Sequence, residues 1–206
     1  MLEINTVEAF RIVEEIFYEN RSRFHGLDKL LSHSYSTGEI CKEFAPLFNL
    51  DPVELAVAGY FHDIGRCFTK DTNNHIFHEI VGANYFENNA ISLGITNTQE
   101  EAANIAQYFR SHFVVYEQFT MPEFQQWLQE LEEIDSSNLK PKSSAEMLVT
   151  YSDLININGN RVSFKQRIED MKTKDEVSSN PRLKAIDRAE KRLYALRDSI
   201  EIIIHQ

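Results

Sequence analysis

Residues 55–66 read Leu-Ala-Val-Ala-Gly-Tyr-Phe-His-Asp-Ile-Gly-Arg, and the rest of the chain is organised around them. The apolar first half of this stretch predicts an interior helix, which the preceding residues 51–54 (Asp-Pro-Val-Glu) would start with an N-cap Asp followed by Pro. The helix ends in His62 and Asp63. A neutral imidazole and a carboxylate in an apolar interior need a partner that offsets their loss of hydration, and a metal ion is the natural one. A glycine-capped helix end, with the histidine bound to a carbonyl and the aspartate in a salt bridge, is the alternative.

Composition predicts one globular domain covering residues 1–206, which is expected to bury roughly 70% of its unfolded surface. With 32 acidic and 21 basic residues the formal charge is -11, which argues against nucleic acid and anionic membranes as partners. Cys41 and Cys67 have neither zinc-motif spacing nor the pattern of a disulfide framework. The chain has no apolar run near the roughly 18 residues of a membrane span. We therefore expect a soluble, cytoplasmic protein.

Apolar residues recur at helical spacing along most of the chain, and few stretches are convincing strands, so the sequence predicts an all-α fold. Several helix starts carry capping residues, as at Asn5, Thr98 and Ser143. Polar loops are expected at 69–74 and 172–179, and a turn at 158–160. The main helices are expected at about residues 5–20, 28–44, 51–63, 75–89, 98–112, 120–134, 143–155 and 180–203.

Two segments are expected to lie outside the core of the domain. Residues 114–142 are interpreted as a helical insertion, with an amphipathic helix from Thr120 to Ile134, that forms a lid or pocket wall. Residues 157–206 form a C-terminal extension ending in a long helix. That helix carries a heptad seam, which predicts packing against the chain's own bundle or, alternatively, a homodimer contact; the seam consists of Ile186, Ala189, Leu193, Leu196, Ile200 and Ile203.

Side chains that can bind a metal recur on the inward faces of five widely separated predicted helices. One histidine on an apolar stripe is usually a core residue with a satisfied ring, but a set of this size is harder to explain as packing. The set consists of His33, His62, Asp63, His78, His112 and Asp153.

The order of these residues, and the local sequences His-Asp-Ile-Gly-Arg (62–66) and His-Glu-Ile-Val-Gly-Ala (78–83), resemble the HD superfamily of metal-dependent phosphohydrolases. The resemblance covers about residues 28–156 and implies an HD-domain helical bundle with a metal site at its centre. It also implies that four residues are the ligands of the basic HD site, namely His33, His62, Asp63 and Asp153. His78 and His112 correspond to the extra histidines of members that hold two metals.

Imidazole and carboxylate ligands together suit iron, manganese, cobalt, nickel or zinc. By resemblance to the members that hold two metals, we expect two divalent transition-metal ions, with iron or manganese foremost. Asp63 can bridge two ions with its two oxygens and so position a hydroxide for in-line attack on a phosphoryl group. An anionic substrate also needs cations near the site, for which Arg66 and Lys70 are the candidates, while His75 is either a phosphate contact or an exposed residue of its helix.

The leading hypothesis is therefore a metal-dependent phosphohydrolase that cleaves a phosphoester or phosphoanhydride of a small, nucleotide-like substrate. No P-loop and no serine or cysteine nucleophile motif competes with it. The first alternative is an HD-type diiron oxygenase acting on a small phosphonate or polyol-like substrate, although residues 24–27 (Phe-His-Gly-Leu) lack the Tyr or Glu expected there. The second is a non-catalytic nucleotide-sensing module.

Overall fold

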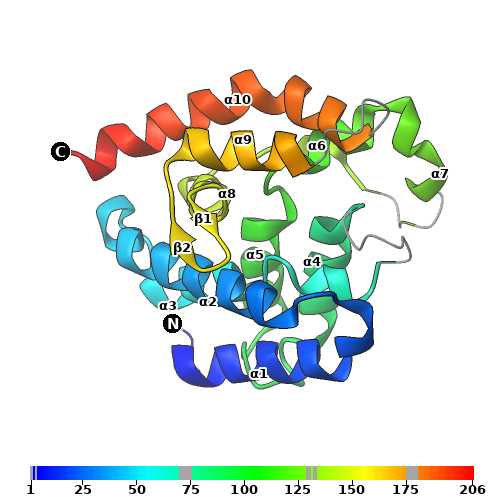
Figure 1. The fold of residues 1–206 in the computed structure, drawn as a ribbon. Coiled ribbons are helices and arrows are strands. Elements are labelled where there is room, and N and C mark those ends of the chain that lie inside the picture. The colour runs from blue at the N-terminus through cyan, green and yellow to red at the C-terminus, as the bar shows by residue number, and fades with distance from the viewer. Residues whose placement is uncertain (1, 3, 70–75, 129–130, 132–133, 175–180) are drawn as a thin grey trace.

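The computed structural model describes residues 2, 4–69, 76–128, 131, 134–174 and 181–206, which form a bundle of helices (Figure 1). The apolar stretch lies in its interior. Helix α3 (Pro52–Phe61) is buried from residue 55 to its end. The Asp51 carboxylate caps it by accepting from the backbone N–H groups of Val53 and Glu54 at 2.7 and 3.2 Å. Around α3 pack α1 (Thr6–Glu19), α2 (Leu27–Phe44), α5 (Gln99–Arg110) and α8 (Ser144–Leu154).

Two hydrophobic cores hold the molecule together. The N-terminal core joins α1 to α5, including α4 (His78–Asn89), through residues such as Val13, Phe17, Phe61, Phe86 and Phe109. The C-terminal core joins α6 (Val115–Thr120), α9 (Phe164–Lys174) and α10 (Pro181–Ile204) to α8 through residues such as Phe124, Leu139, Phe164, Ile186 and Leu193. Helices α2, α4 and α8 contribute to both cores.

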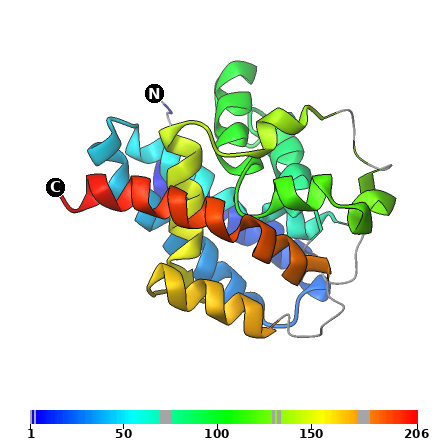
Figure 2. The ribbon, with the colours of Figure 1, turned by 90° about the horizontal axis from the view of Figure 1, so that it is seen from above.

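The heptad seam of α10 faces the chain's own bundle. Its residues from Ile186 to Ile200 are buried and Ile203 is half-buried. Helix α10 runs across α8 and packs against α6, α8 and α9 (Figure 2). The interpretation that the seam packs within the chain therefore agrees with the structure.

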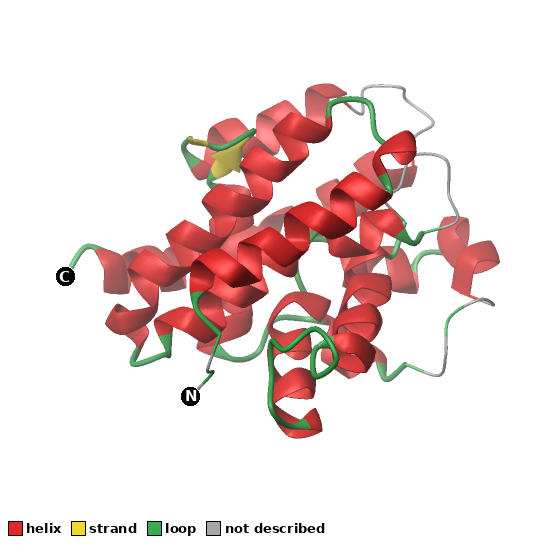
Figure 3. Cartoon of the chain, turned by 90° about the horizontal axis from the view of Figure 1, so that it is seen from below, coloured by secondary structure: helices red, strands yellow, loops and turns green. Residues whose placement is uncertain are grey.

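Almost all regular structure is helical, which confirms the all-α prediction (Figure 3). Among the described residues the exception is a short antiparallel hairpin of β1 (Asn156–Ile157) and β2 (Asn160–Arg161), whose turn is the one predicted at 158–160. The capping boxes predicted at Thr98 and Ser143 are both formed. Within the described part of the chain, the helices are either too short or too polar to cross a bilayer.

The prediction of one amphipathic helix from Thr120 to Ile134 is wrong. Helix α6 ends at Thr120, a 3₁₀ turn covers Pro122–Phe124, and α7 covers only Gln125–Leu128. The cause is Pro122, which lacks a backbone N–H and disfavours the helical conformation of the residue before it. Met121 accordingly adopts extended dihedral angles of -95° and 133°.

Two predicted helices are shorter at the ends that carry candidate ligands. Helix α4 begins at His78 rather than near residue 75, and α5 ends at Arg110, so that His112 lies beyond it. Part of the loop predicted at 172–179 is helical, since α9 extends to Lys174, and the remainder lies outside the described residues.

Glycines allow the segments around residue 63 to approach closely. A Cβ atom on Gly65 would lie 1.9 Å from the carbonyl oxygen of His78, and one on Gly82 would lie 2.8 Å from the backbone nitrogen of Gly65. The 3₁₀ turn Ile64–Cys67 therefore packs directly on the first turn of α4. This contact brings Asp63 and His78 together.

Candidate metal centre

The six predicted ligands come from five separate segments and gather in the interior. His33 lies on α2, and His62 and Asp63 follow the last residue of α3. His78 is the first residue of α4, while the others are His112, just beyond α5, and Asp153, near the end of α8. The exposed fraction of each residue lies between 0% and 7%. The fold therefore brings the six predicted residues together in one buried group.

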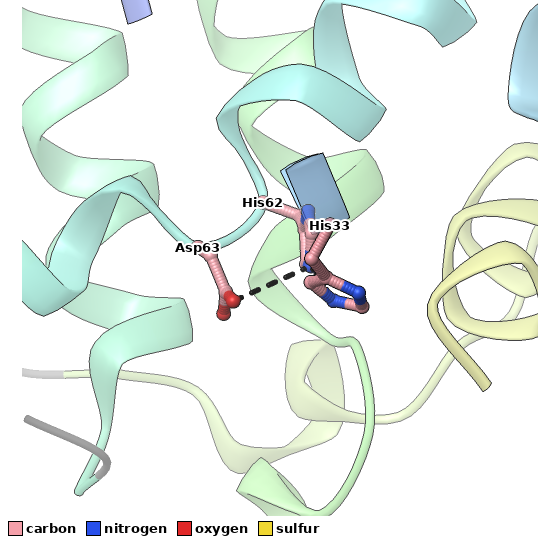
Figure 4. A group of neighbouring side chains, drawn as sticks. All are labelled: His33, His62 and Asp63. Atoms are coloured by element: carbon pink, nitrogen blue, oxygen red, sulfur yellow. Dashed lines mark hydrogen bonds and ion pairs between the residues drawn. The ribbon is translucent and has the colours of Figure 1, made fainter. Parts of the chain in front are cut away.

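One side of the group consists of the two histidines of α2 and α3 with Asp153. The His33 Nε2 atom lies 3.0 Å from Asp153 Oδ1 and 3.2 Å from His62 Nε2. His62 Nε2 in turn lies 3.7 Å from Asp63 Oδ2. Figure 4 shows the side chains of His33, His62 and Asp63 meeting where α2 passes the end of α3.

The other side of the group contains His78 and His112. His78 Nε2 lies 3.0 Å from Asp63 Oδ1. The ring centroid of His112 lies 5.2 Å from that of His62 and 5.3 Å from that of His78. Ligand atoms within 4.8 Å of one another form three overlapping sets that could each hold a metal ion: His33 with His62 and Asp63, His62 with His112 and Asp153, and Asp63 with His78 and His112.

Asp63 lies in two of these sets, and its two oxygens have different surroundings. Its Oδ1 atom contacts His78 and also lies 2.8 Å from Arg66 Nε. Its Oδ2 atom is buried and has no hydrogen-bond partner among the described residues. A buried carboxylate oxygen without a donor fits a metal ion, so this donor set suits the metal that the sequence indicates.

Backbone carbonyl groups orient two of the imidazole rings. His62 Nδ1 lies 2.7 Å from the carbonyl oxygen of Gly59, and His112 Nδ1 lies 2.6 Å from that of Phe109. Because a carbonyl oxygen can only accept, the proton of each neutral ring is on Nδ1. The lone pair of Nε2 then faces the other ligands, which is the tautomer that binds a metal.

The protonation states of His62, Asp63 and Asp153 also favour metal binding. Burial is the main cause that lowers the pKa of His62 to about 3, so this ring is neutral near pH 7. Burial would raise the pKa of Asp63, but the charge of Arg66 and the hydrogen bond with His78 hold it well below its usual range. Burial likewise opposes ionisation of Asp153, whose pKa is nevertheless lowered by the hydrogen bond from His33. Neutral imidazoles and ionised carboxylates are the ligand forms that metals require.

Sequence reasoning missed Glu79, which directly follows His78. Its side chain is fully buried, and its Oε2 atom lies 3.2 Å from His78 Nδ1. Burial would lower the pKa of His78, but the charge of Glu79 and contact with Asp63 raise it. A carboxylate beside the second nitrogen of a ligand histidine fixes the orientation of the ring. The sequence signal was a glutamate within an apolar helix turn.

The backbone next to the two outer histidines has unusual dihedral angles. Phe77, immediately before His78, and Phe113, immediately after His112, have φ values of 54°, and both are buried. Positive φ is rare for bulky residues and tends to occur at functional sites. These two turns shorten α4 and α5 relative to the sequence prediction.

Of the predicted phosphate-binding residues, Arg66 lies at the site, where it is ion-paired with Asp63. Lys70 and His75 lie outside the described residues. A second arginine, Arg167 of α9, was missed; its Nη2 atom lies 3.7 Å from Asp153 Oδ1.

Comparison with known proteins agrees with this geometry. Residues 30–155 match the HD domain family. Ribonuclease Y proteins from two strains of Ureaplasma parvum serovar 3 are each 36% identical over 64 residues, which cover 30% of this chain and 14% of the relative. No solved structure matches the chain. Because the family match includes more than half of the sequence and all segments from His33 to Asp153 that carry the candidate ligands, this protein belongs to the HD domain family, a superfamily of metal-dependent phosphohydrolases.

Proposed function

We propose that this protein is a metal-dependent phosphohydrolase that cleaves a phosphoester or phosphoanhydride bond of a small, nucleotide-like molecule. The observation that carries the proposal is the position of Asp63, shared between two of the three candidate ligand sets, with one buried oxygen that lacks a donor. Two divalent ions, preferably iron or manganese, would be held by His33, His62, Asp63, His78, His112 and Asp153.

When bound, such ions supply the activation of a water molecule and the polarisation of a phosphoryl oxygen. Other groups of the chain would keep the ligand side chains in the orientation that binds these ions. His62 and His112 keep their protons on the nitrogen that faces a carbonyl oxygen, which leaves the other nitrogen available as a ligand. Arg66, whose side chain is 18% exposed, adds positive charge beside Asp63 and would interact with a substrate phosphate.

A small substrate fits the charge of the molecule better than RNA. The curated relatives are named as ribonucleases, but they match less than a third of this chain. The net charge of -11 opposes binding of a long polyanion, because affinity for nucleic acid depends on neutralising many phosphates. A mononucleotide or dinucleotide needs only local cations.

The insertion, residues 114–142, is proposed as the wall that selects the substrate. An aromatic series connects it to the site: the ring centroids of Trp127 and Phe124 are 6.3 Å apart, as are those of Phe124 and Phe77. Phe77 directly precedes His78. A change in the insertion therefore has a direct packing route to a candidate ligand.

The test is a hydrolysis screen, with substrates and products separated by chromatography, of Mn²⁺-loaded protein against mononucleotides, dinucleoside polyphosphates, sugar phosphates and an RNA oligonucleotide, each with and without air. The proposal predicts hydrolysis of a small substrate that does not depend on oxygen. Turnover that requires oxygen would instead establish the oxygenase alternative, and cleavage of RNA alone would place the activity with that of the relatives. Binding of a nucleotide without turnover would favour the sensing module.

A further inference from the structure

Arg167 brings a cation to the metal centre from outside the family match. It lies on α9, in the C-terminal extension, whereas the match ends at residue 155. Its Nη2 atom is 3.7 Å from Asp153 Oδ1, and its side chain is 15% exposed. Because Asp153 is a candidate ligand, the guanidinium group borders the site itself.

The position of this guanidinium group is fixed by the packing of α9. Phe164, Ile168 and Met171 are each less than 5% exposed and belong to the C-terminal core. The ring of Phe164 stacks on that of Tyr151 in α8, with centroids 6.4 Å apart and planes 17° apart. Helix α9 therefore presents Arg167 to the end of α8, where Asp153 lies.

The hydrogen-bonding capacity of Arg167 is only partly used. Its Nη1 atom lies 3.3 Å from Asp170 Oδ2, one turn away on the same helix. Its distance to Asp153 is that of an ion pair rather than a hydrogen bond. Its Nε atom is buried and has no hydrogen-bond partner among the described residues. Since buried donors normally have acceptors, this N–H group points to a ligand.

Each aspartate of the centre thus has an arginine beside it. Arg66 pairs with Asp63 from the turn after α3, and Arg167 lies beside Asp153 from α9. The chain has a net charge of -11, so two arginines that border one buried site are a local concentration of positive charge that can attract an anion. The planar fork of a guanidinium group matches two oxygens of a phosphate.

We propose that Arg167 binds a phosphate group of the substrate, so that the C-terminal extension forms part of the substrate site. This assignment rests on the proposed function, because it concerns the same metal centre. The competing explanation is that Arg167 only supports Asp153. The two differ in what is lost on substitution: phosphate affinity in the first case and metal binding in the second.

The experiment measures binding of inorganic phosphate to the Mn²⁺-loaded protein by calorimetry, with the manganese content of every sample determined by elemental analysis. Arg167→Gln removes the charge, and Arg167→Lys keeps it without the fork. Arg161→Gln is the matched control, because Arg161 lies in the same extension but pairs with Glu43. Circular dichroism checks that each variant is folded; if Arg167→Gln is unfolded, Arg167→Lys decides the question.

We expect Arg167→Gln to retain the wild-type manganese content and to bind phosphate about tenfold more weakly or worse, which is the effect of losing a hydrogen bond to a charged group. Arg167→Lys should fall between this variant and the wild type, and Arg161→Gln should match the wild type. Unchanged phosphate affinity in Arg167→Gln, or loss of manganese from it, would overturn the assignment. Absence of manganese from the wild-type protein would instead overturn the proposed function, and this assignment with it.

Discussion

The N-terminal and C-terminal cores differ in what they bring to the metal centre. The helices of the N-terminal core position five of the six candidate ligands, and α8, which belongs to both cores, carries Asp153. The C-terminal core adds Arg167 and the aromatic side chains that reach Phe77. We propose that the N-terminal core holds the metal ligands, whereas the C-terminal core selects the substrate.

The largest effect is expected from a substitution that disrupts the close contact between residue 65 and the first turn of α4. Gly65→Ala would place a Cβ atom 1.9 Å from the carbonyl oxygen of His78, and backbone atoms cannot move aside as a flexible side chain can. We expect the free energy of unfolding in urea to fall by about 3 kcal/mol, together with loss of metal binding.

The matched control is Gly94→Ala. Gly94 has a φ of 70° but open space around its Cβ position, so only backbone strain of about 1 kcal/mol is expected. Equal destabilisation of the two variants would show that the close packing of residue 65 on α4 does not matter.

The second-largest effect is expected on the affinity for one of the two metal ions. Glu79→Gln keeps the size of the side chain but removes the charge that faces His78 Nδ1 at 3.2 Å. The affinity for the second Mn²⁺ ion should fall by about tenfold, with the first ion retained, because partners of ligand histidines typically contribute this much.

Calorimetric titration of metal-free protein measures both affinities. Glu87→Gln is the control, since Glu87 lies on the same helix but pairs with Arg110. If Glu79→Gln bound the second ion as tightly as the wild type, Glu79 would have no role in orienting His78.

The smallest effect is expected from a substitution of Glu146, whose hydrogen bonds connect α8 to α5 and to the residue that follows it. Glu146 accepts hydrogen bonds from Gln107 Nε2 at 2.7 Å and Ser111 Oγ at 3.1 Å, and it completes the capping box of Ser143. Burial alone would raise the pKa of Glu146, but the hydrogen bonds from Gln107 and Ser143 bring it below the ordinary value of 4.5.

Because the pKa of Glu146 is lower in the folded state, its stabilising contribution is complete above pH 4.5 and is lost as the pH falls through the folded value. Glu146→Gln should therefore cost about 1 kcal/mol near neutral pH and progressively less below pH 4.5. Urea unfolding at several pH values, with the exposed Glu15→Gln as control, measures this. A cost that stays constant down to pH 3 would contradict it.

The sequence predicted the N-terminal core well because its signals are local. Caps such as Asp51 and Thr98 and the uninterrupted apolar residues 55–61 determine the helices without reference to the rest of the chain. The six candidate ligands followed from their placement on these helices and from the resemblance to the HD superfamily.

The missed features depend on contacts between distant segments. Arg167 approaches Asp153 only because α9 folds back on α8, and no periodicity shows that. The strained turns at Phe77 and Phe113 also left no local signal, since phenylalanine rarely has a positive φ. Pro122, by contrast, was a visible helix breaker inside the segment predicted as one helix.

The most direct test of the account is the number of transition-metal ions per chain in the purified, Mn²⁺-reconstituted protein, measured by elemental analysis beside three variants. We predict two ions in the wild type, one in His112→Ala, none in Asp63→Ala, and two in the surface control Asp187→Ala, with all four proteins folded. Retention of both ions by Asp63→Ala would contradict the central claim that this carboxylate is shared by two metal ions.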